Sequence, residues 1–386
     1  MGHKGKMLPV LGEILLHEGR NASSFADPFC GSAAVSWYMA QHTKRPVIAG
    51  DLQSYAAMRA AAVVMRDKTI DPDMIILPWF ERARKVSDRI FDYFPNHIKS
   101  LQPELKEYEH IQAEVHRSRM FSAEVLPGII AKTGGVWPTS KAYSGYYYSP
   151  AQAMILDALR QTLPEDNDQK NIALAALIEA ASKCAAAPGH TAQPFQPTES
   201  AAKYIFEAWK KDVYHYVAKA VTEISAIHSD AIGKAIIGDY KQTIAELSEG
   251  DLVFADPPYS GVHYSRFYHV LETICNGTEM EVSGRGRYPD PQYRPASSFS
   301  RKSESLNAAK EFLDLCAKKK LNVVLTFPVN KSSNGLGSED FISIGKECFS
   351  EVKVEEVESN FSTLGGNKIH RNPRALCNES IIVFRS

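Results

Sequence analysis

The chain has 386 residues, of which 44% are hydrophobic and 23% are charged, values ordinary for a soluble protein with one large or two medium cores. Its 44 lysines and arginines nearly balance 45 aspartates and glutamates, and the net charge of -1 excludes general electrostatic attraction of the whole molecule to nucleic acid. Any such binding needs a local basic patch. No charged leader with an apolar segment opens the sequence, and no apolar run approaches the roughly 20 residues of a membrane helix, so we expect a cytoplasmic protein.

Six cysteines are scattered along the chain without a C-x-x-C pair. Their spacing matches neither a disulfide framework nor a zinc site, and we expect reduced, mostly buried thiols and no metal. They are Cys30, Cys184, Cys275, Cys316, Cys348 and Cys377.

Five short apolar runs that end in Asp, Gly or Pro are typical of buried parallel strands. They lie near residue 25 and at 45–51, 234–239, 251–258 and 321–328. Two later runs, 351–359 and 379–386, resemble edge or antiparallel strands.

Between about residues 70 and 230 the pattern changes to that of helices. Apolar residues recur at three- and four-residue spacing over 201–227, which predicts an amphipathic helix, and a shorter stripe follows Ile155, Leu159 and Leu163. The longer stripe consists of Ile205, Trp209, Val213, Tyr216, Ala220, Ile224 and Ile227.

These patterns predict an α/β fold in which an open sheet is interrupted by a helical insertion. We assign residues 1–70 and 230–386 to the sheet domain and 71–229 to the insertion. The segment "NKSSNGLGS" (330–338) is interpreted as a flexible loop.

Acidic residues stand at the ends of the predicted strands. Asp27, Asp51 and Asp256 each end one, and Asp239 adds a fourth. Open α/β sheets bind ligands outside the carboxyl ends of their strands, so these acids indicate a ligand site.

The stretch 25–36 contains a strand, a tight turn and the small residues that start a helix. Gly31 and Ser32 allow a ligand to approach the backbone, and the helix N-terminus favours a carboxylate. Asp51 follows about 20 residues later, where Rossmann-like folds place an acid on ribose hydroxyls. It can equally be the N-cap of the helix expected over 52–65, and position alone does not decide.

The sequence "DPPY", Asp256 to Tyr259, fixes a carboxylate, a backbone carbonyl and an aromatic ring in one rigid corner. Such a corner suits an exocyclic amino group, whose two N–H bonds Asp256 and the Pro257 carbonyl can accept while Tyr259 stacks on the heterocycle. The alternative is a strand that ends in a turn, with its Asp capping a helix.

The order of these motifs resembles that of S-adenosylmethionine-dependent DNA adenine-N6 methyltransferases of the alpha group, the Dam-like adenine methylases. The resemblance rests on "GHKGKMLP" (2–9), "FADPFCGSAAVS" (25–36), "GDLQSYA" (50–56), "IIGDY" (236–240) and "DPPYSGVHYSRFYHVLETI" (256–274). It implies a Rossmann-like class I methyltransferase sheet and S-adenosylmethionine as the cofactor.

The resemblance also implies roles for residues at the matching positions. The target base would meet Asp256, Pro257, Pro258 and Tyr259. The cofactor would meet Lys4, Asp27, Pro28, Phe29, Gly31, Ser32, Asp51, Leu52, Asp239 and Tyr240. One position departs from the family pattern, because Ala33 stands where a second glycine is usual. Its methyl group could crowd the cofactor, but alanine is small enough that we expect binding to be tolerated.

A flipped-out base requires a surface that grips the phosphate backbone. The segment 284–302 supplies one candidate, with the nucleic-acid residues Arg285, Arg287, Tyr288, Arg294, Arg301 and Lys302 and the interleaved aromatics Tyr293 and Phe299. The alternative is a solvated loop that closes over the active site. A second candidate patch is 132–149, and the insertion 71–229 is a candidate target-recognition domain.

The histidines near the "DPPY" motif, His263 and His269, are interpreted as structural or phosphate-side groups. Three functions stay open. The first is site-specific adenine methylation of DNA in a restriction-modification or phage-defence setting, with any endonuclease or defence partner a separate protein and no membrane involved. The second is methylation of an RNA base. The third is a catalytically weak, S-adenosylmethionine-binding DNA-binding protein.

Overall fold

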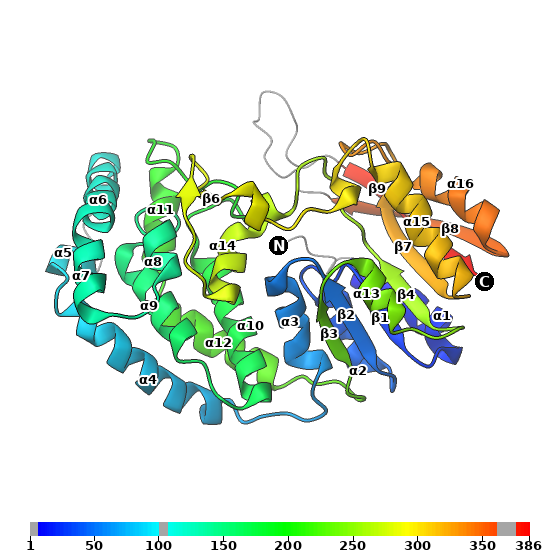
Figure 1. Ribbon diagram of the computed structural model, residues 1–386, viewed down its shortest axis with the longest axis horizontal. Coiled ribbons are helices and arrows are strands. Elements are labelled where there is room, and N and C mark those ends of the chain that lie inside the picture. The colour runs from blue at the N-terminus through cyan, green and yellow to red at the C-terminus, as the bar shows by residue number, and fades with distance from the viewer. Residues whose placement is uncertain (1–6, 100–106, 361–375) are drawn as a thin grey trace. The chain divides into compact units, whose positions relative to one another are not determined.

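The computed structural model describes residues 7–99, 107–360 and 376–386, and it divides into two compact units (Figure 1). Unit 1 consists of Met1–Lys68, His228–Ser265 and Pro295–Ser386. Unit 2 consists of Thr69–Ile227 and Arg266–Arg294.

A seven-stranded sheet forms the centre of unit 1, in the order β3-β2-β1-β4-β7-β9-β8. The first five strands in that order are parallel, and β9 is antiparallel to both of its neighbours. Every apolar run identified in the sequence is a strand, and the expected Rossmann-like α/β fold is confirmed. The strands are β1 (Phe25–Asp27), β2 (Val47–Asp51), β3 (Lys234–Ile237), β4 (Leu252–Ala255), β7 (Asn322–Pro328), β8 (Glu351–Asn360) and β9 (Leu376–Arg385).

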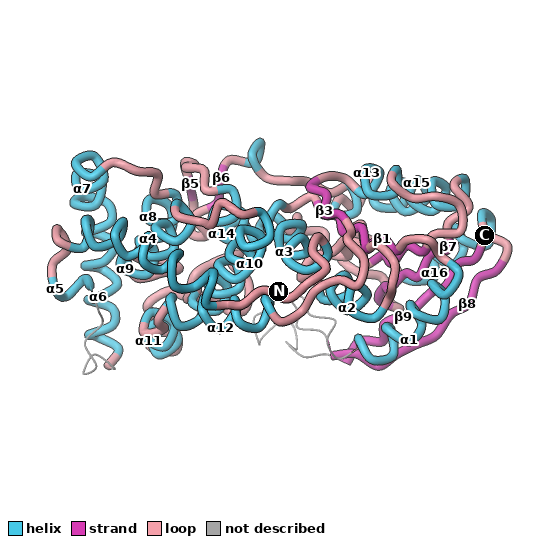
Figure 2. The backbone as a smooth tube through the Cα atoms, turned by 90° about the horizontal axis from the view of Figure 1, so that it is seen from below, coloured by secondary structure: helices cyan, strands magenta, loops and turns pink. Residues whose placement is uncertain are grey.

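Helices cover both faces of this sheet, as is usual when parallel strands are buried on both sides. Figure 2 shows α13 (Tyr240–Ala245) and α15 (Ser305–Lys318) on one side of the strands and α1 (Leu8–Glu18) and α2 (Ala34–His42) on the other. The helices α3 (Ser54–Val64) and α16 (Ser338–Cys348) complete these layers. On the α13 side, alternate strand residues pack against the helices in one core, which includes Ala26, Ile48, Val253, Leu325, Phe312 and Phe341.

The strand order reverses between β1 and β4. From β1 the chain builds outward to β2 and β3, and it then returns to place β4 on the other side of β1. At such a switch point the connecting helices leave in opposite directions, which opens the carboxyl edge to a ligand.

Unit 2 is helical except for a short hairpin. A buried cluster that includes Ile111, Val115, Ile205 and Trp209 forms part of its core. Its helices are α4 (Asp73–Phe91), α5 (Asn96–Lys99), α6 (Tyr108–Met120), α7 (Leu126–Thr133), α8 (Pro138–Tyr143), α9 (Pro150–Gln161), α10 (Asn167–Cys184), α11 (Ala202–Trp209), α12 (Val213–Ser225) and α14 (Ser265–Asn276). The hairpin strands are β5 (Val282–Ser283) and β6 (Tyr288–Pro289).

The helix predicted over 201–227 is two helices. The Asp212 carboxylate accepts a hydrogen bond of 2.9 Å from the Tyr214 amide and caps the start of α12. This cap begins a new helix even though the apolar stripe continues across the break.

The boundary of the helical unit also differs from the one drawn from the sequence, which placed 230–386 in a single domain. Residues 266–294 pack with unit 2 because their bonds go to its helices. The Tyr143 hydroxyl lies 2.9 Å from the Thr273 hydroxyl, and Arg160 donates to the Cys275 carbonyl at 3.0 Å.

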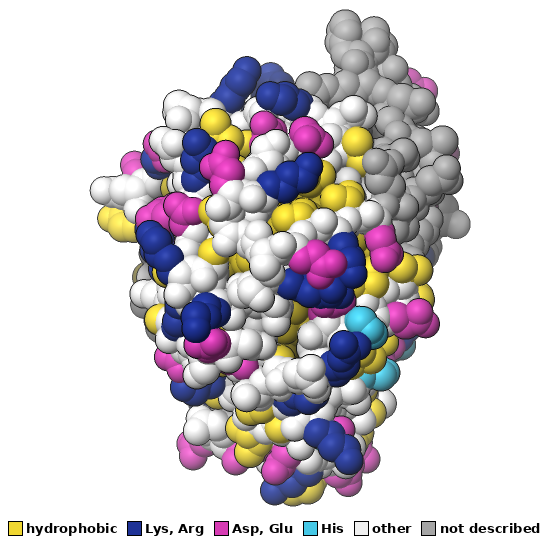
Figure 3. Space-filling model, turned by 90° about the vertical axis from the view of Figure 1, so that its right-hand side faces the viewer, with side chains coloured by type: hydrophobic (Ala, Val, Ile, Leu, Met, Phe, Trp, Pro, Cys, Tyr) yellow, Lys and Arg dark blue, Asp and Glu magenta, His cyan; other side chains and the backbone are white. Residues whose placement is uncertain are grey.

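The surface carries mixed charge, as the near balance of acids and bases predicts. On the face shown in Figure 3, basic and acidic side chains are interspersed. Among the described helices none is both long and apolar enough to cross a membrane. Four cysteines, at 30, 184, 275 and 316, are buried thiols, and Cys348 is half-buried.

Candidate active site

The parallel strands bring the predicted acids to one edge of the sheet. Asp27 and Asp51 are the last residues of β1 and β2, and Asp256 directly follows β4. Asp51 and Asp256 both raise the pKa of Asp27 through their charge, so the three carboxylates lie within electrostatic reach of one another. The edge at the switch point is therefore strongly acidic and favours a cationic ligand.

Asp27 is the most buried of these acids, with 1% of its surface exposed. Its Oδ2 accepts a hydrogen bond of 2.6 Å from the Ser36 hydroxyl, while its Oδ1 is buried without a hydrogen bond. Burial raises the pKa of Asp27 to about 7. A buried carboxylate oxygen without a donor is costly, and a donor supplied by a ligand would satisfy it.

Asp51 joins the two loops at this edge. Its Oδ2 accepts the Gly31 amide at 3.0 Å, and its Oδ1 accepts the Gln53 amide at 2.9 Å. Gln53, not Asp51, is the N-cap of α3, so the interpretation of Asp51 as that cap is wrong. Asp51 instead holds the glycine turn after β1 against the end of β2. The Oε1 of Gln53 is a second buried oxygen without a hydrogen bond.

Ala33 occupies a backbone conformation that glycine adopts without strain. Its φ is 62° and its ψ is 9°, and it is the N-cap of α2. The residue is fully buried. A left-handed conformation costs an L-residue with a Cβ about 1–2 kcal/mol, so this position carries local strain as well as an added methyl group.

Asp239 and Tyr240 follow β3. The Asp239 side chain accepts the Lys241 amide at 3.0 Å and so caps α13, which leaves its other oxygen without a hydrogen bond among the described residues. The Tyr240 ring lies 5.9 Å from that of Phe29, centre to centre, and both rings pack against Phe312. These aromatic rings form an apolar wall beside the acids.

The "DPPY" corner is tied to β7 and to the loop that follows it. The fully buried Thr326 hydroxyl donates to Asp256 Oδ1 at 3.0 Å. The Asn334 side chain donates to the Pro258 carbonyl at 3.1 Å and to the Phe299 carbonyl at 3.0 Å. The Tyr259 ring meets the ring of Phe327 edge to face, at 6.4 Å between centres.

Two residues that hold this corner were missed in the sequence. The segment 330–338 was interpreted as a flexible loop, yet Asn334 is fully buried and the Ser333 hydroxyl accepts the Gly261 amide at 2.9 Å. An Asn-Gly pair is an ordinary turn signal, and nothing local marks its amide as a structural donor. Thr326 carried no signal beyond being a polar residue inside an apolar strand.

The basic patch predicted over 284–302 is divided between the two units. Arg285, Arg287, Tyr288 and Arg294 belong to unit 2, whereas Arg301 and Lys302 belong to unit 1. Arg301 pairs with Glu304 at 3.0 Å. Phe299 was counted among the interleaved aromatics, but it is fully buried in the core of unit 1.

The second candidate patch, 132–149, is mostly interior. Trp137, Tyr143, Tyr147 and Tyr148 are at most 2% exposed. An aromatic-rich sequence can form a core as readily as a binding surface, and here it forms part of the core of unit 2. His269 is also buried, with its Nε2 2.8 Å from the Gly286 carbonyl, and burial lowers its pKa to about 4.

The remaining predicted cofactor residues surround the acids or fall outside the described chain. Pro28 is buried, and Ser32 and Leu52 are half-buried. Lys4 lies outside the described residues. Among the residues that the structure describes, no group of three or more His, Cys, Asp or Glu is placed to hold a metal ion.

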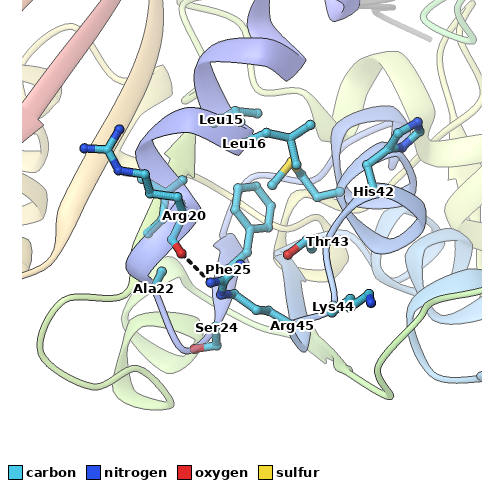
Figure 4. Close-up of a pocket in the computed structure, with 13 residues that line it drawn as sticks. Leu15, Leu16, Arg20, Ala22, Ser24, Phe25, His42, Thr43, Lys44 and Arg45 are labelled. Carbon is cyan, nitrogen blue, oxygen red and sulfur yellow. Dashed lines mark hydrogen bonds between the residues drawn. The ribbon is translucent and has the colours of Figure 1, made fainter.

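A separate pocket of about 640 Å³ opens at the other edge of the sheet, beside the first residues of β1 and β4. Figure 4 shows apolar side chains such as Leu16 and Phe25 together with Arg20, Lys44 and Arg45, whose guanidinium donates to the Arg20 carbonyl. None of the predicted site residues lines this pocket.

Two comparisons with known proteins bear on the family. Residues 136–325 match the model of the family described as D12 class N6 adenine-specific DNA methyltransferase. This range includes Asp239 and the "DPPY" corner, whereas Asp27 and Asp51 precede it.

A curated protein, "Modification methylase LlaI" from Lactococcus lactis subsp. lactis, is 33% identical to this chain over 118 residues. The match covers 30% of this chain and 17% of that relative, so it spans less than a fifth of the relative's length. Both comparisons support the family resemblance drawn from the motifs: this chain is similar to the D12 class N6 adenine-specific DNA methyltransferases.

Proposed function

We propose that the protein transfers the methyl group of S-adenosylmethionine to the exocyclic N6 amino group of adenine in DNA, at a specific site. The observation that carries this proposal is the "DPPY" corner beside the buried Asp27 and the half-buried Asp51 at the switch point of the sheet. The family match over residues 136–325 supports it.

The acidic edge suits the charge of this cofactor. When bound, S-adenosylmethionine supplies a methyl group on a positively charged sulfur, and it also carries an ammonium group. Asp27 Oδ1 and Gln53 Oε1 are buried acceptors without donors, and a cationic ligand with N–H groups can satisfy such atoms. Asp51 would hold the ribose, and Asp239 and Tyr240 the adenine ring.

The corner orients the reacting amine. The Asp256 carboxylate, which accepts the Thr326 hydroxyl at Oδ1, would accept one N–H of the target adenine. The Pro257 carbonyl accepts the second N–H, since the Pro258 carbonyl is taken by Asn334. Both bonds draw the nitrogen lone pair out of the ring and toward the methyl group, and Tyr259 supports the base by stacking.

Transfer is then a direct displacement, in which one N–C bond forms as the S–C bond breaks. The methylated nitrogen would then carry a positive charge and two protons, and it would lose one of these protons afterwards, while the cofactor would leave as the neutral sulfide. This chemistry depends on orientation rather than on a covalent nucleophile. Thr326 and Asn334 are positioning residues, because they fix the Asp256 carboxylate and the Pro258 backbone without contacting the base.

The biological setting follows from the same family. The name of the Lactococcus lactis relative describes it as a modification methylase. We propose that this protein also acts in restriction-modification or phage defence, in the cytoplasm, with the endonuclease supplied by a separate chain. Unit 2 is the proposed target-recognition unit.

The test is methyl transfer from labelled S-adenosylmethionine to unmethylated duplex DNA and, in parallel, to RNA, with digestion to nucleosides. Labelled N6-methyladenosine in the DNA sample is the expected result. If only the RNA sample were labelled, the proposed methyl transfer would stand, but the substrate would be RNA instead of DNA. Cofactor binding without label in either nucleic acid would contradict the proposed activity.

A further inference from the structure

Two tyrosine rings in unit 2 each carry two arginines. The guanidinium carbons of Arg119 and Arg287 lie 4.4 and 4.5 Å from the ring centre of Tyr146. Those of Arg266 and Arg294 lie 4.8 and 5.7 Å from the ring centre of Tyr288. We call these the Tyr146 pair and the Tyr288 pair. Because Arg287 and Tyr288 are neighbours in the chain, the two pairs adjoin.

The backbone holds the Tyr146 pair in place. Arg119 Nε donates to the Gly145 carbonyl at 3.0 Å, and Arg287 Nε donates to the Ala142 carbonyl at 2.7 Å. A terminal nitrogen of Arg287 also donates to the Lys141 carbonyl at 3.5 Å, and the remaining terminal N–H groups of the pair can meet another acceptor. The Arg119 terminal nitrogens make no hydrogen bond to any described residue.

The chain also bends to present Arg287. This residue has a φ of 53°, the left-handed conformation that glycine prefers, at the end of the β5–β6 turn. The Tyr288 hydroxyl donates to the Ala192 carbonyl, which fixes the second ring. The second ring is therefore anchored by its hydroxyl, and the first pair is held by the backbone bonds of its two arginines.

Neither pair is neutralised by an acid. In the described parts of the chain, no carboxylate lies within ion-pair distance of any of these four arginines. Burial is the main cause that lowers the pKa of Arg119, and the neighbouring Arg287 charge lowers it further. By contrast, Arg117 forms an ion pair of 2.7 Å with Glu114, which lies one helical turn earlier.

The chemistry of these pairs selects an anion with several oxygens. Guanidinium groups bind phosphate through two parallel N–H bonds, and stacking on an aromatic ring fixes their planes for that purpose. A stacked nucleobase is a poorer fit, because the guanidiniums already occupy the ring surfaces on which a base would stack.

We propose that the Tyr146 pair and the Tyr288 pair are two phosphate sites that hold the backbone of the DNA substrate. Each pair shares one phosphate, whose negative charge removes the repulsion between its two arginines. The inference rests on the proposed function for the identity of the phosphate donor. It adds Arg119, Tyr146 and Arg266 to the DNA-binding residues, and none of these was identified in the sequence.

The test is the salt dependence of DNA binding by the full chain, measured by fluorescence anisotropy on an unmethylated duplex between about 50 and 200 mM salt. Each lost phosphate contact is expected to reduce the slope of log K against log salt by about 0.9. The variant Arg119→Gln/Arg287→Gly should reduce it by about one contact, and Arg266→Gln/Arg294→Gln by another. Glycine is chosen at 287 because it tolerates the positive φ.

Sharing of one phosphate makes a second, sharper prediction. Arg119→Gln alone should already produce most of the slope change of its pair variant, because a phosphate held between two arginines loses its site when either one is removed. Tyr146→Ala removes the ring that holds both arginines and should weaken DNA binding. If Arg119→Gln and the Arg287 substitution each reduced the slope by a full contact, and the pair variant by two, the two arginines would bind separate phosphates and the shared site would be wrong.

Arg84 provides the matched control, since it stacks on Tyr214 at 5.0 Å in the same unit. Besides burial, the charges of Asp88 and Asp212 both raise the pKa of Tyr214, so this arginine has acidic neighbours. Arg84→Gln should leave the slope unchanged. If the pair variants melt near the wild-type temperature and match Arg84→Gln in slope, the phosphate sites are wrong.

The same samples separate this inference from the proposed function. Methyl transfer with unchanged slopes in the pair variants would overturn the phosphate sites and leave the activity standing. Salt-dependent DNA binding that the pair variants reduce, without any methyl transfer by the wild type, would overturn the activity and support the sites.

Discussion

The two units gather opposite charges and place them by different means. Unit 1 collects Asp27, Asp51 and Asp256 at the carboxyl edge of its sheet, and unit 2 collects four arginines on two tyrosines. Backbone topology positions the acids, because parallel strands end at a common edge. Side-chain stacking positions the arginines. The near-zero net charge of the chain therefore conceals two regions, each suited to a ligand of opposite sign.

The largest expected effect tests whether the acidic edge is the chemical centre. Asp256→Ala should reduce methyl transfer by about 10³-fold, since the amine loses the acceptor that activates it. Cofactor affinity should stay unchanged in a direct binding titration. Asp290→Ala, which removes an exposed acid that only caps a turn in unit 2, should leave transfer unaffected. Normal turnover by Asp256→Ala would remove that residue from the mechanism.

Asp27 tests whether the charge of the acids in unit 1 lacks stabilising partners in the ligand-free protein. Its pKa rises from 3.8 to about 7 in the folded protein, so the native state binds this proton more tightly than the unfolded chain. The stabilising contribution is complete below pH 4 and is lost as pH rises through 7, a change on the order of 4 kcal/mol. Asp27→Asn should abolish this part of the pH slope.

Urea unfolding of the ligand-free protein between about pH 4 and 8 measures that slope. A cationic cofactor should bind the ionised form of Asp27 better, so its affinity should rise with pH through 7 in the wild type and much less in Asp27→Asn. Parallel stability curves for the two proteins would mean that the fold already compensates this charge.

Asn334 tests how far the corner depends on a distant loop. Asn334→Ala leaves the Pro258 and Phe299 carbonyls without their donor, and we expect a loss of about 1–3 kcal/mol in the free energy of unfolding. Methyl transfer should fall while cofactor affinity changes little. Ser333→Ala, which removes one bond to the Gly261 amide, is the milder control. Equal stability of the two variants would reduce Asn334 to an ordinary turn residue.

The smallest expected effect comes from Ala33, where glycine should change the free energy of unfolding in the opposite direction from glycine inside the following helix. Ala33→Gly should stabilise the protein by about 1 kcal/mol, because glycine adopts a φ of 62° without strain. It should also tighten cofactor binding. Ala40→Gly, inside α2, should instead destabilise the protein by about 0.5–1 kcal/mol. The same sign for both substitutions would show that the positive φ carries no strain.

The sequence predicted the parts of the fold that local patterns encode. Each parallel strand is a short apolar run with a clear end, and the acids at those ends follow from the same pattern, as with Asp27 after "FA" and Asp256 after "LVFA". The "DPPY" corner could be predicted because all of its groups lie within four consecutive residues.

Contacts between distant segments could not be predicted in this way. Asn334 reaches Pro258 from 76 positions away, and Arg119 meets Arg287 only because α6 and the hairpin share one tyrosine. The break between α11 and α12 was missed for a related reason, since a continuous apolar stripe does not reveal a cap. Helical periodicity reports which face is buried but not whether one helix or two provide it.

The path of the chain has a practical consequence for engineering. It leaves unit 1 after residue 68 and again after residue 265, and it returns at 228 and at 295. Unit 2 is therefore assembled from two separate segments of the chain, and the second segment contains the hairpin and its arginines. A graft of this unit onto a known DNA methylase would have to transplant both segments together, because the first segment alone would lack Arg266, Arg287 and Arg294.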